Sequence, residues 1–79
     1  MFIVYMYDVK ADNEKKFNRV KRLFYYYLNK IELKRDVWRT KSTLAVPPKM
    51  EKTMDSFFSK FKKDVVVFKF FTDGIEQLS

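Results

Sequence analysis

Residues 2–9 alternate between two faces that are both apolar, which is typical of a strand in the interior of a β-sheet. One face carries Phe2, Val4 and Met6, and the other carries Ile3, Tyr5 and Tyr7. The first charged residue, Asp8, comes at the end of this apolar run. The pattern therefore predicts a central strand that ends with a carboxylate.

The next segment has the spacing of an amphipathic helix, from about Glu14 to Asn29. Either Asp12 or Asn13 can cap its first turn, and Glu14 lies where a negative charge favours the helix dipole. Apolar residues recur at regular intervals along it: Phe17, Val20, Phe24, Tyr27 or Leu28, and Ile31. Asn29 is expected to end the helix.

Two short strands are predicted next, over residues 37–40 and 42–46, after a turn at residues 34–36. The two strands can be joined by a bulge in place of a clean hairpin. Pro47 and Pro48 end the second strand, because proline cannot donate a hydrogen bond to a neighbouring strand and suits the start of a helix.

The clearest helical pattern follows, over about residues 49–62. Its apolar stripe consists of Met50, Met54, Phe57, Phe58 and Phe61. Residues 65–71 then predict a last strand, and residues 72–74 a turn. Residues 75–79 are expected to add an edge strand or to pack on a partner subunit.

The order strand, helix, strand, strand, helix, strand predicts an α+β fold of the ferredoxin-like type. In this fold a four-stranded antiparallel sheet carries two helices on one face. The 79 residues are expected to form a single domain, with residues 71–79 as a short tail. The other face of the sheet is left for a second copy of the chain or for a nucleic acid.

Lysine and arginine total 17 against 10 acidic residues, which gives a net charge of +7. This charge favours nucleic acid as a partner, although many small basic proteins bind nothing acidic. Nine Phe and five Tyr exceed what one small core can bury, which favours a homodimer. No apolar run approaches the ~20 residues that a membrane-spanning helix needs, so no membrane partner is expected.

The composition excludes several reaction classes. The chain has no cysteine and no histidine, so disulfides, zinc fingers, thiol nucleophiles and histidine-dependent triads are ruled out. With one glycine it cannot contain a phosphate-binding loop or a dinucleotide-binding motif. The lack of cysteine fits a cytoplasmic location.

Most of the basic residues lie in the first two thirds of the sequence and are candidates for binding phosphates. The candidates are Lys10, Lys15, Lys16, Arg19, Arg22, Arg39 and Lys41, with Lys21, Lys34 and Arg35 in the same set. Arg39 is the strongest single candidate, because arginine can hold a phosphate with two hydrogen bonds. The alternative is an ordinary solvated helix face. The tyrosines at 25–27 and Trp38 are candidates for stacking on bases or for the core.

Asp8 is the candidate for catalysis. A carboxylate at the end of an apolar strand can hold a hard cation, or it can simply cap the turn that follows. A two-fold dimer could bring two Asp8 side chains together, and their mutual repulsion would favour a divalent ion between them. Mg²⁺ suits oxygen ligands and could activate water to hydrolyse a phosphodiester bond without histidine.

Two stretches resemble the CRISPR-associated Cas-two proteins. Residues 2–9, which end in Tyr-Asp-Val, look like the opening strand of that family, and residues 18–29 look like its first helix. The resemblance covers residues 1–31 well and residues 32–71 in outline. Residues 37–44 depart from the family pattern, because Trp38 stands where the family has glutamine.

The resemblance implies a role in antiviral defence for a homodimer with Asp8 as catalytic residue and as ligand of one shared Mg²⁺ ion. It implies an endonuclease that cleaves RNA or DNA, and a partnership with the Cas-one integrase on duplex DNA, with RNA as a second nucleic-acid partner. Two other hypotheses stay open. One is a non-catalytic DNA- or RNA-binding protein on the same fold, and the other is a protein-interaction module whose aromatic excess is an interface.

Overall fold

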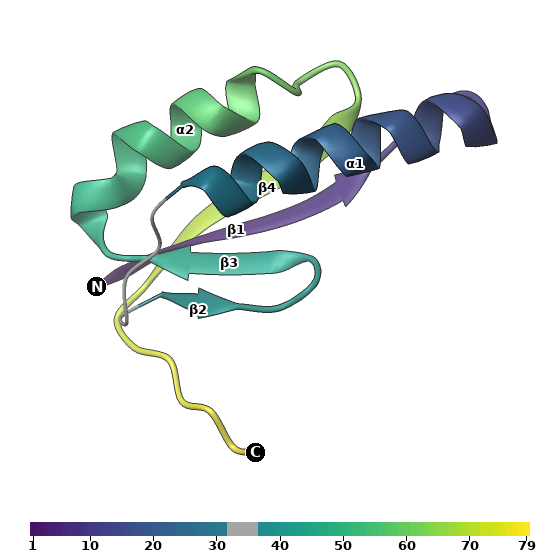
Figure 1. Cartoon of the computed structure of the whole chain (residues 1–79). Helices are drawn as coiled ribbons and strands as arrows, with labels where there is room; N and C mark the ends of the chain where they lie inside the picture. Colours follow the sequence, from purple (N-terminus) through teal and green to yellow (C-terminus); the bar gives the residue numbers. More distant parts are fainter. Residues whose placement is uncertain (32–36) are drawn as a thin grey trace.

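The computed structural model describes residues 1–31 and 37–79, which form one antiparallel sheet of four strands with two α-helices on one face (Figure 1). Along the chain the elements are β1 (Phe2–Val9), α1 (Glu14–Lys30), β2 (Trp38–Arg39), β3 (Thr43–Val46), a 3₁₀ turn η1 (Pro48–Met50), α2 (Glu51–Ser59) and β4 (Val65–Thr72). The strands lie in the order β2-β3-β1-β4. This arrangement confirms the predicted ferredoxin-like α+β fold.

Strand β1 is central, as its two apolar faces predicted. It pairs with β3 on one side and along its whole length with β4 on the other. The residues that face the helices are Ile3, Tyr5, Tyr7 and Val9, and all four are buried. The even-numbered residues lie on the opposite face of the sheet, called the open face below, where Met6 is 47% exposed.

Helix α1 begins where the sequence predicted, with Asn13 as its N-cap. The Asn13 side-chain oxygen accepts a hydrogen bond from the Lys16 amide at 2.8 Å, which satisfies one of the free N–H groups of the first turn. The helix runs one residue past Asn29. Of the two alternatives in its apolar stripe, Leu28 is buried and Tyr27 is exposed.

Strands β2 and β3 form a tight hairpin. Arg39 pairs with Leu44, and the Thr40 amide donates to the Thr43 carbonyl at 2.8 Å in the same register. Because the register does not change along the hairpin, the bulge considered for this connection is wrong.

Helix α2 is shorter than the sequence predicted. It ends at Ser59 rather than near Lys62, and residues 60–64 form a turn before β4. The amides of Lys60 and Phe61 donate to carbonyls three residues earlier, a tightening that is common at helix ends. Phe61 still packs against the core from this turn, so the apolar stripe outlasts the helix.

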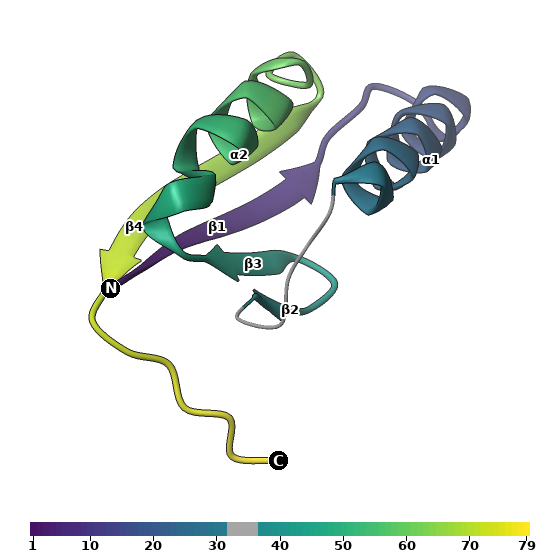
Figure 2. The same cartoon turned by 60° about the vertical axis from the view of Figure 1, so that its left-hand side comes forward.

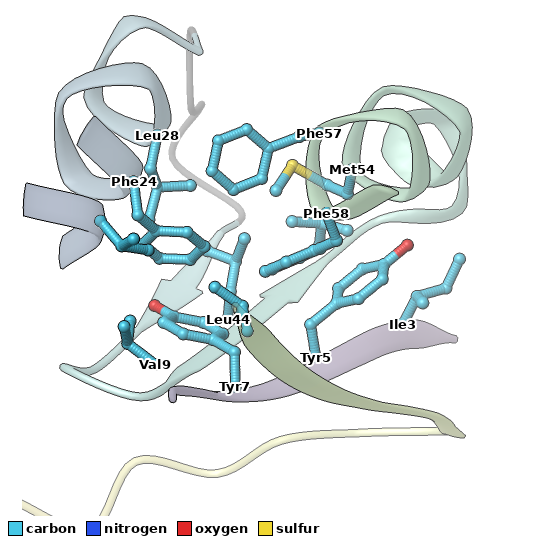
Figure 3. Close-up of a cluster of buried hydrophobic side chains, with 13 residues drawn as sticks. Ile3, Tyr5, Tyr7, Val9, Phe24, Leu28, Leu44, Met54, Phe57 and Phe58 are labelled. Atoms are coloured by element: carbon cyan, nitrogen blue, oxygen red, sulfur yellow. The ribbon is translucent and has the colours of Figure 1, made fainter. Parts of the chain in front are cut away.

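The core fills the space between the sheet and the two helices (Figure 3). Phe24 of α1 is fully buried there, and its ring centroid lies 5.1 Å from that of Phe57 and 5.2 Å from that of Tyr7. The buried helix residues are Val20, Phe24 and Leu28 of α1 and Met54, Phe57 and Phe58 of α2. Large rings supply much buried apolar area, which a domain of this size needs because it buries a smaller fraction of its surface on folding than a larger domain does.

Residues 73–79 leave the end of β4 on the side of the sheet away from the helices (Figure 2). They have no regular secondary structure, so the single chain does not form the edge strand predicted at residues 75–79. Packing of this tail on a partner subunit stays a prediction. The turn predicted at residues 34–36, with the candidates Lys34 and Arg35, lies outside the described residues.

Candidate nucleic-acid interface

Helix α1 carries much of the chain's positive charge. Its 17 residues include six lysines and arginines and one acidic residue, Glu14. Three of the cations recur at intervals of four and three residues on the side opposite the buried stripe, and they are called the outer cations below: Lys15, Arg19 and Arg22. They line a surface groove together with Asn13, Lys16 and Asn18. The structure thus brings four of the predicted phosphate-binding residues together on one helix.

The predicted phosphate-binding cations differ in whether a carboxylate pairs with them. Lys16 Nζ lies 3.4 Å from Asp64 Oδ1, and Lys10 Nζ lies 3.0 Å from Asp8 Oδ2. Among the described residues, no carboxylate lies within salt-bridge distance of the outer cations. Within the described residues, the outer cations are therefore not neutralised by a carboxylate, whereas Lys10 and Lys16 are.

Arg39 and Lys41 belong to the β2–β3 hairpin, apart from the outer cations. Arg39 Nη2 donates to Asn29 Oδ1 at 3.0 Å, and the Lys41 carbonyl accepts a hydrogen bond from the Tyr25 hydroxyl at 2.7 Å. These two hydrogen bonds tie the hairpin to α1. Lys41 also lines, with Lys21, a small pocket of about 230 Å³. Arg39, the strongest single candidate in the sequence, thus already has a partner within the chain.

The Tyr7 hydroxyl is buried beneath α1. Among the described residues it is the one buried side-chain polar atom without a hydrogen-bond partner. Burial raises the pKa of Tyr7, the neighbouring Tyr25 phenol raises it further, and the Arg39 guanidinium partly opposes both. The phenol therefore stays protonated near neutral pH and cannot serve there as a general base.

Asp8 is the penultimate residue of β1 and lies on the open face of the sheet, in register with Val66 of β4. Its side chain is 69% exposed and forms the ion pair with Lys10. The N-cap of the following helix is Asn13, not Asp8. In the part of the chain that the structure describes, no three acidic side chains come close enough together to hold a metal ion. One chain therefore offers a single exposed carboxylate at this position.

A charged cluster that sequence reasoning missed joins β4 to α2. Asp55 accepts hydrogen bonds from Lys69 Nζ at 2.9 Å and from the Tyr5 hydroxyl at 2.7 Å, and Glu51 also pairs with Lys69. Burial raises the pKa of Tyr5, and Asp55 raises it further. Burial opposes the ionisation of Asp55, but the hydrogen bonds from Lys69 and Tyr5 outweigh it and hold the pKa of Asp55 below its usual value. A lone lysine within an apolar strand was the one signal of this cluster in the sequence.

The open face of the sheet is largely apolar. Four exposed residues of β1 and β4 form what is called the open-face patch below: Met6 (47% exposed), Val66 (42%), Phe68 (67%) and Phe70 (44%). Phe68 is in register with Met6, and Phe70 with Val4. A groove of about 800 Å³ lies between this face and the tail and is lined in part by Trp38, Ala45 and Ile75. Neighbouring exposed apolar side chains of this kind are typical of a protein interface.

No helix in residues 1–31 or 37–79 is long and apolar enough to cross a membrane. The ferredoxin-like fold serves many unrelated functions, so the fold by itself assigns none. The sequence matches no family model, and no curated protein or solved structure is significantly similar to it.

Proposed function

We propose that this protein is a homodimer that binds nucleic acid through the outer face of α1. The observation that carries the proposal is the concentration of charge on this helix, which holds six of the chain's 17 basic residues against one acidic residue. Among the described residues the outer cations have no carboxylate partner. Lysine and arginine at regular intervals on a rigid helix are suited to a row of phosphates.

The open-face patch is the proposed interface between two copies. It lies on the side of the sheet away from the helices, so two chains that meet through it leave both α1 helices outward (Figure 2). The four members of the patch are apolar and uncharged, which favours a second copy over a nucleic acid at this surface. The dimer would therefore present two basic helices, and two linked contacts bind more tightly than one.

The test removes two outer cations. We expect Arg19→Ala/Arg22→Ala to weaken binding to a fluorescent oligonucleotide, measured by anisotropy over a range of salt concentrations. For each α1 helix that contacts the nucleic acid, the magnitude of the slope of log affinity against log salt should fall by about 1.4 for a single strand or about 1.8 for a duplex, because each phosphate contact contributes about 0.7 or about 0.9. The matched control is Lys62→Ala/Lys63→Ala, which removes the same charge from the exposed turn before β4 and should keep the wild-type slope.

Equal losses in the two variants would mean that net charge, and not the outer face of α1, attracts the nucleic acid. If the wild-type protein bound no strand or duplex even at low salt, the proposal would be wrong, and a protein-interaction module would be favoured.

Endonuclease activity is a second candidate, because Asp8 shares a shallow pocket with Met6 and Phe68 beside the proposed dimer interface. The resemblance to the Cas-two proteins implies a Mg²⁺ ion between two such aspartates. One chain does not fit the ion by itself, since its exposed carboxylate is paired with Lys10 and belongs to no group of three or more acidic side chains among the described residues. The integrase partner stays a prediction from the resemblance.

Cleavage of labelled RNA and DNA, with Mg²⁺ or with EDTA, tests this candidate. If paired Asp8 side chains hold the ion, wild-type cleavage requires Mg²⁺ and Asp8→Asn abolishes it. Binding of the same oligonucleotides in EDTA should not be weakened in Asp8→Asn, because the substitution removes a negative charge. Cleavage that persists in Asp8→Asn would show that Asp8 has no catalytic role.

A further inference from the structure

We infer that the outer face of α1 binds single-stranded nucleic acid, with the Tyr26 ring stacking on an unpaired base. The inference rests on the proposed function and adds the class of nucleic acid to it. It differs from the duplex DNA that the resemblance implies. The residues that carry it are an exposed aromatic side chain and the cations on either side of it along the helix.

Tyr26 lies on the same line of α1 as the outer cations. Arg19, Arg22, Tyr26 and Lys30 follow one another at intervals of three and four residues, which places them on one face of the helix. With Lys15 included, the line is about 22 Å long at a rise of about 1.5 Å per residue. A strand along this line meets cations before and after the ring, so phosphates on both sides of a stacked base find a partner.

The tyrosines at 25–27 do not share one environment. The Tyr25 side chain is half-buried, and its hydroxyl donates to the Lys41 carbonyl. Tyr26 and Tyr27 are 52% and 49% exposed, and their ring centroids are 5.2 Å apart with the ring planes at 78°. Edge contact with Tyr27 supports the Tyr26 ring from the side without burying it.

Lys30 completes the arrangement. Its Nζ lies 4.5 Å from the centroid of the Tyr26 ring, a cation–π contact at the protein surface. A base can stack on Tyr26 by displacing this ammonium group, which is then free to contact a neighbouring phosphate. The Tyr26 ring would thus contact the base, and Lys30 a phosphate.

Base stacking favours a single strand over other polyanions. A duplex keeps the faces of its bases within its own stack, whereas a single strand offers them to aromatic side chains. A polyanion without bases would use the outer cations but gain nothing from the tyrosine ring. The exposed ring on a cationic face therefore points to unpaired bases.

The experiment compares three probes that share phosphate chemistry: a short oligothymidylate, an abasic strand of the same length, and a closed hairpin duplex. We expect the wild-type protein to bind oligothymidylate about 5- to 150-fold more tightly than the abasic strand, the range that one base–aromatic stack provides. Tyr26→Leu should remove this preference without changing the affinity for the abasic strand. Tyr26→Phe should keep the preference, because the ring remains.

Leu23→Ala is the matched control, since Leu23 is 42% exposed on the same helix and has no ring. It should bind the three probes as the wild type does. Salt-dependent binding of all three probes with no effect of Tyr26→Leu would overturn the stacking inference and leave the proposed function in place. Binding to anionic lipid vesicles but to none of the three probes would overturn both.

Discussion

Phe68→Glu is expected to convert the proposed homodimer into a monomer and to raise its dissociation constant at least about 100-fold. An unpaired charge buried in an apolar interface costs several kcal/mol, and about 1.4 kcal/mol is worth a factor of ten. Phe68 is the most exposed member of the open-face patch, at 67%, and is in register with Met6 at the centre of the sheet. In a two-fold interface each residue occurs twice, so one substitution introduces two carboxylates. Sedimentation or light scattering over a range of concentrations measures the dissociation constant.

Phe71→Glu is the matched control. Phe71 lies on the same strand and is 56% exposed, so replacing it by glutamate adds the same charge at a similarly accessible position. Phe71 is in register with Ile3, however, and lies on the helix side of the sheet. This variant should stay dimeric. If Phe68→Glu also stayed dimeric, or if both variants dissociated alike, the open-face patch would not be the interface. Circular dichroism should show that both variants fold, since both positions are exposed in the single chain.

Phe24→Ala is expected to destabilise the fold by about 3–5 kcal/mol, the usual cost of removing a buried aromatic ring. Phe24 is fully buried, and its ring contacts those of Tyr7, Phe57 and Phe61. It therefore links α1 to the sheet and to α2. Alanine would leave a cavity at the point where these three elements meet. Small domains have a total stability of about 5–15 kcal/mol, so this one substitution removes a large part of it.

Thermal unfolding at a fixed protein concentration measures this effect, because the midpoint of the proposed dimer would depend on concentration. We expect the midpoint of Phe24→Ala to fall by at least about 12 °C, since each kcal/mol lowers it by about 4–8 °C in a domain of this size. Leu23→Ala, at the neighbouring exposed position, should change stability by less than about 0.5 kcal/mol. Similar midpoints for the two variants would contradict the central place of Phe24 in the core.

The candidate site was predictable from the sequence in part. The stripe from Val20 to Leu28 identifies the buried side of α1, and the outer cations follow from it, because residues opposite a buried stripe face the solvent. The sequence did not show which of the other basic residues have partners within the chain. Lys16 is paired with Asp64, and Arg39 donates to Asn29. These partners come from other elements of the fold, and nothing in the local sequence announces them.

The tyrosines at 25–27 also show what the sequence could predict and what depended on the rest of the fold. In sequence the tyrosines at 25–27 are equivalent candidates for the core and for stacking. A helix turns by about 100° per residue, so three successive side chains point in three directions. Their environments then depend on where the sheet lies. Tyr25 turns toward the β2–β3 hairpin and bonds to it, whereas Tyr26 and Tyr27 stay exposed.

The end of α2 also depended on more than the local pattern. The apolar stripe runs on to Phe61, which predicted a helix to about Lys62. The chain instead tightens after Ser59, and the turn that follows leads directly into β4. Phe61 keeps its contact with the core from within the turn, so its apolar character was correct evidence for burial but not for helix.

The sequence by itself determined the order of the elements, the central place of β1 and the buried face of each helix. These follow from the period of apolar residues, which is a local property of the chain. Only the tertiary structure decided which charges and rings are already engaged by partners within the chain. The ion pair between Lys16 and Asp64 and the hydrogen bond from the Tyr25 hydroxyl to the Lys41 carbonyl join residues that are far apart in the sequence. These contacts form only when the helices pack on the sheet.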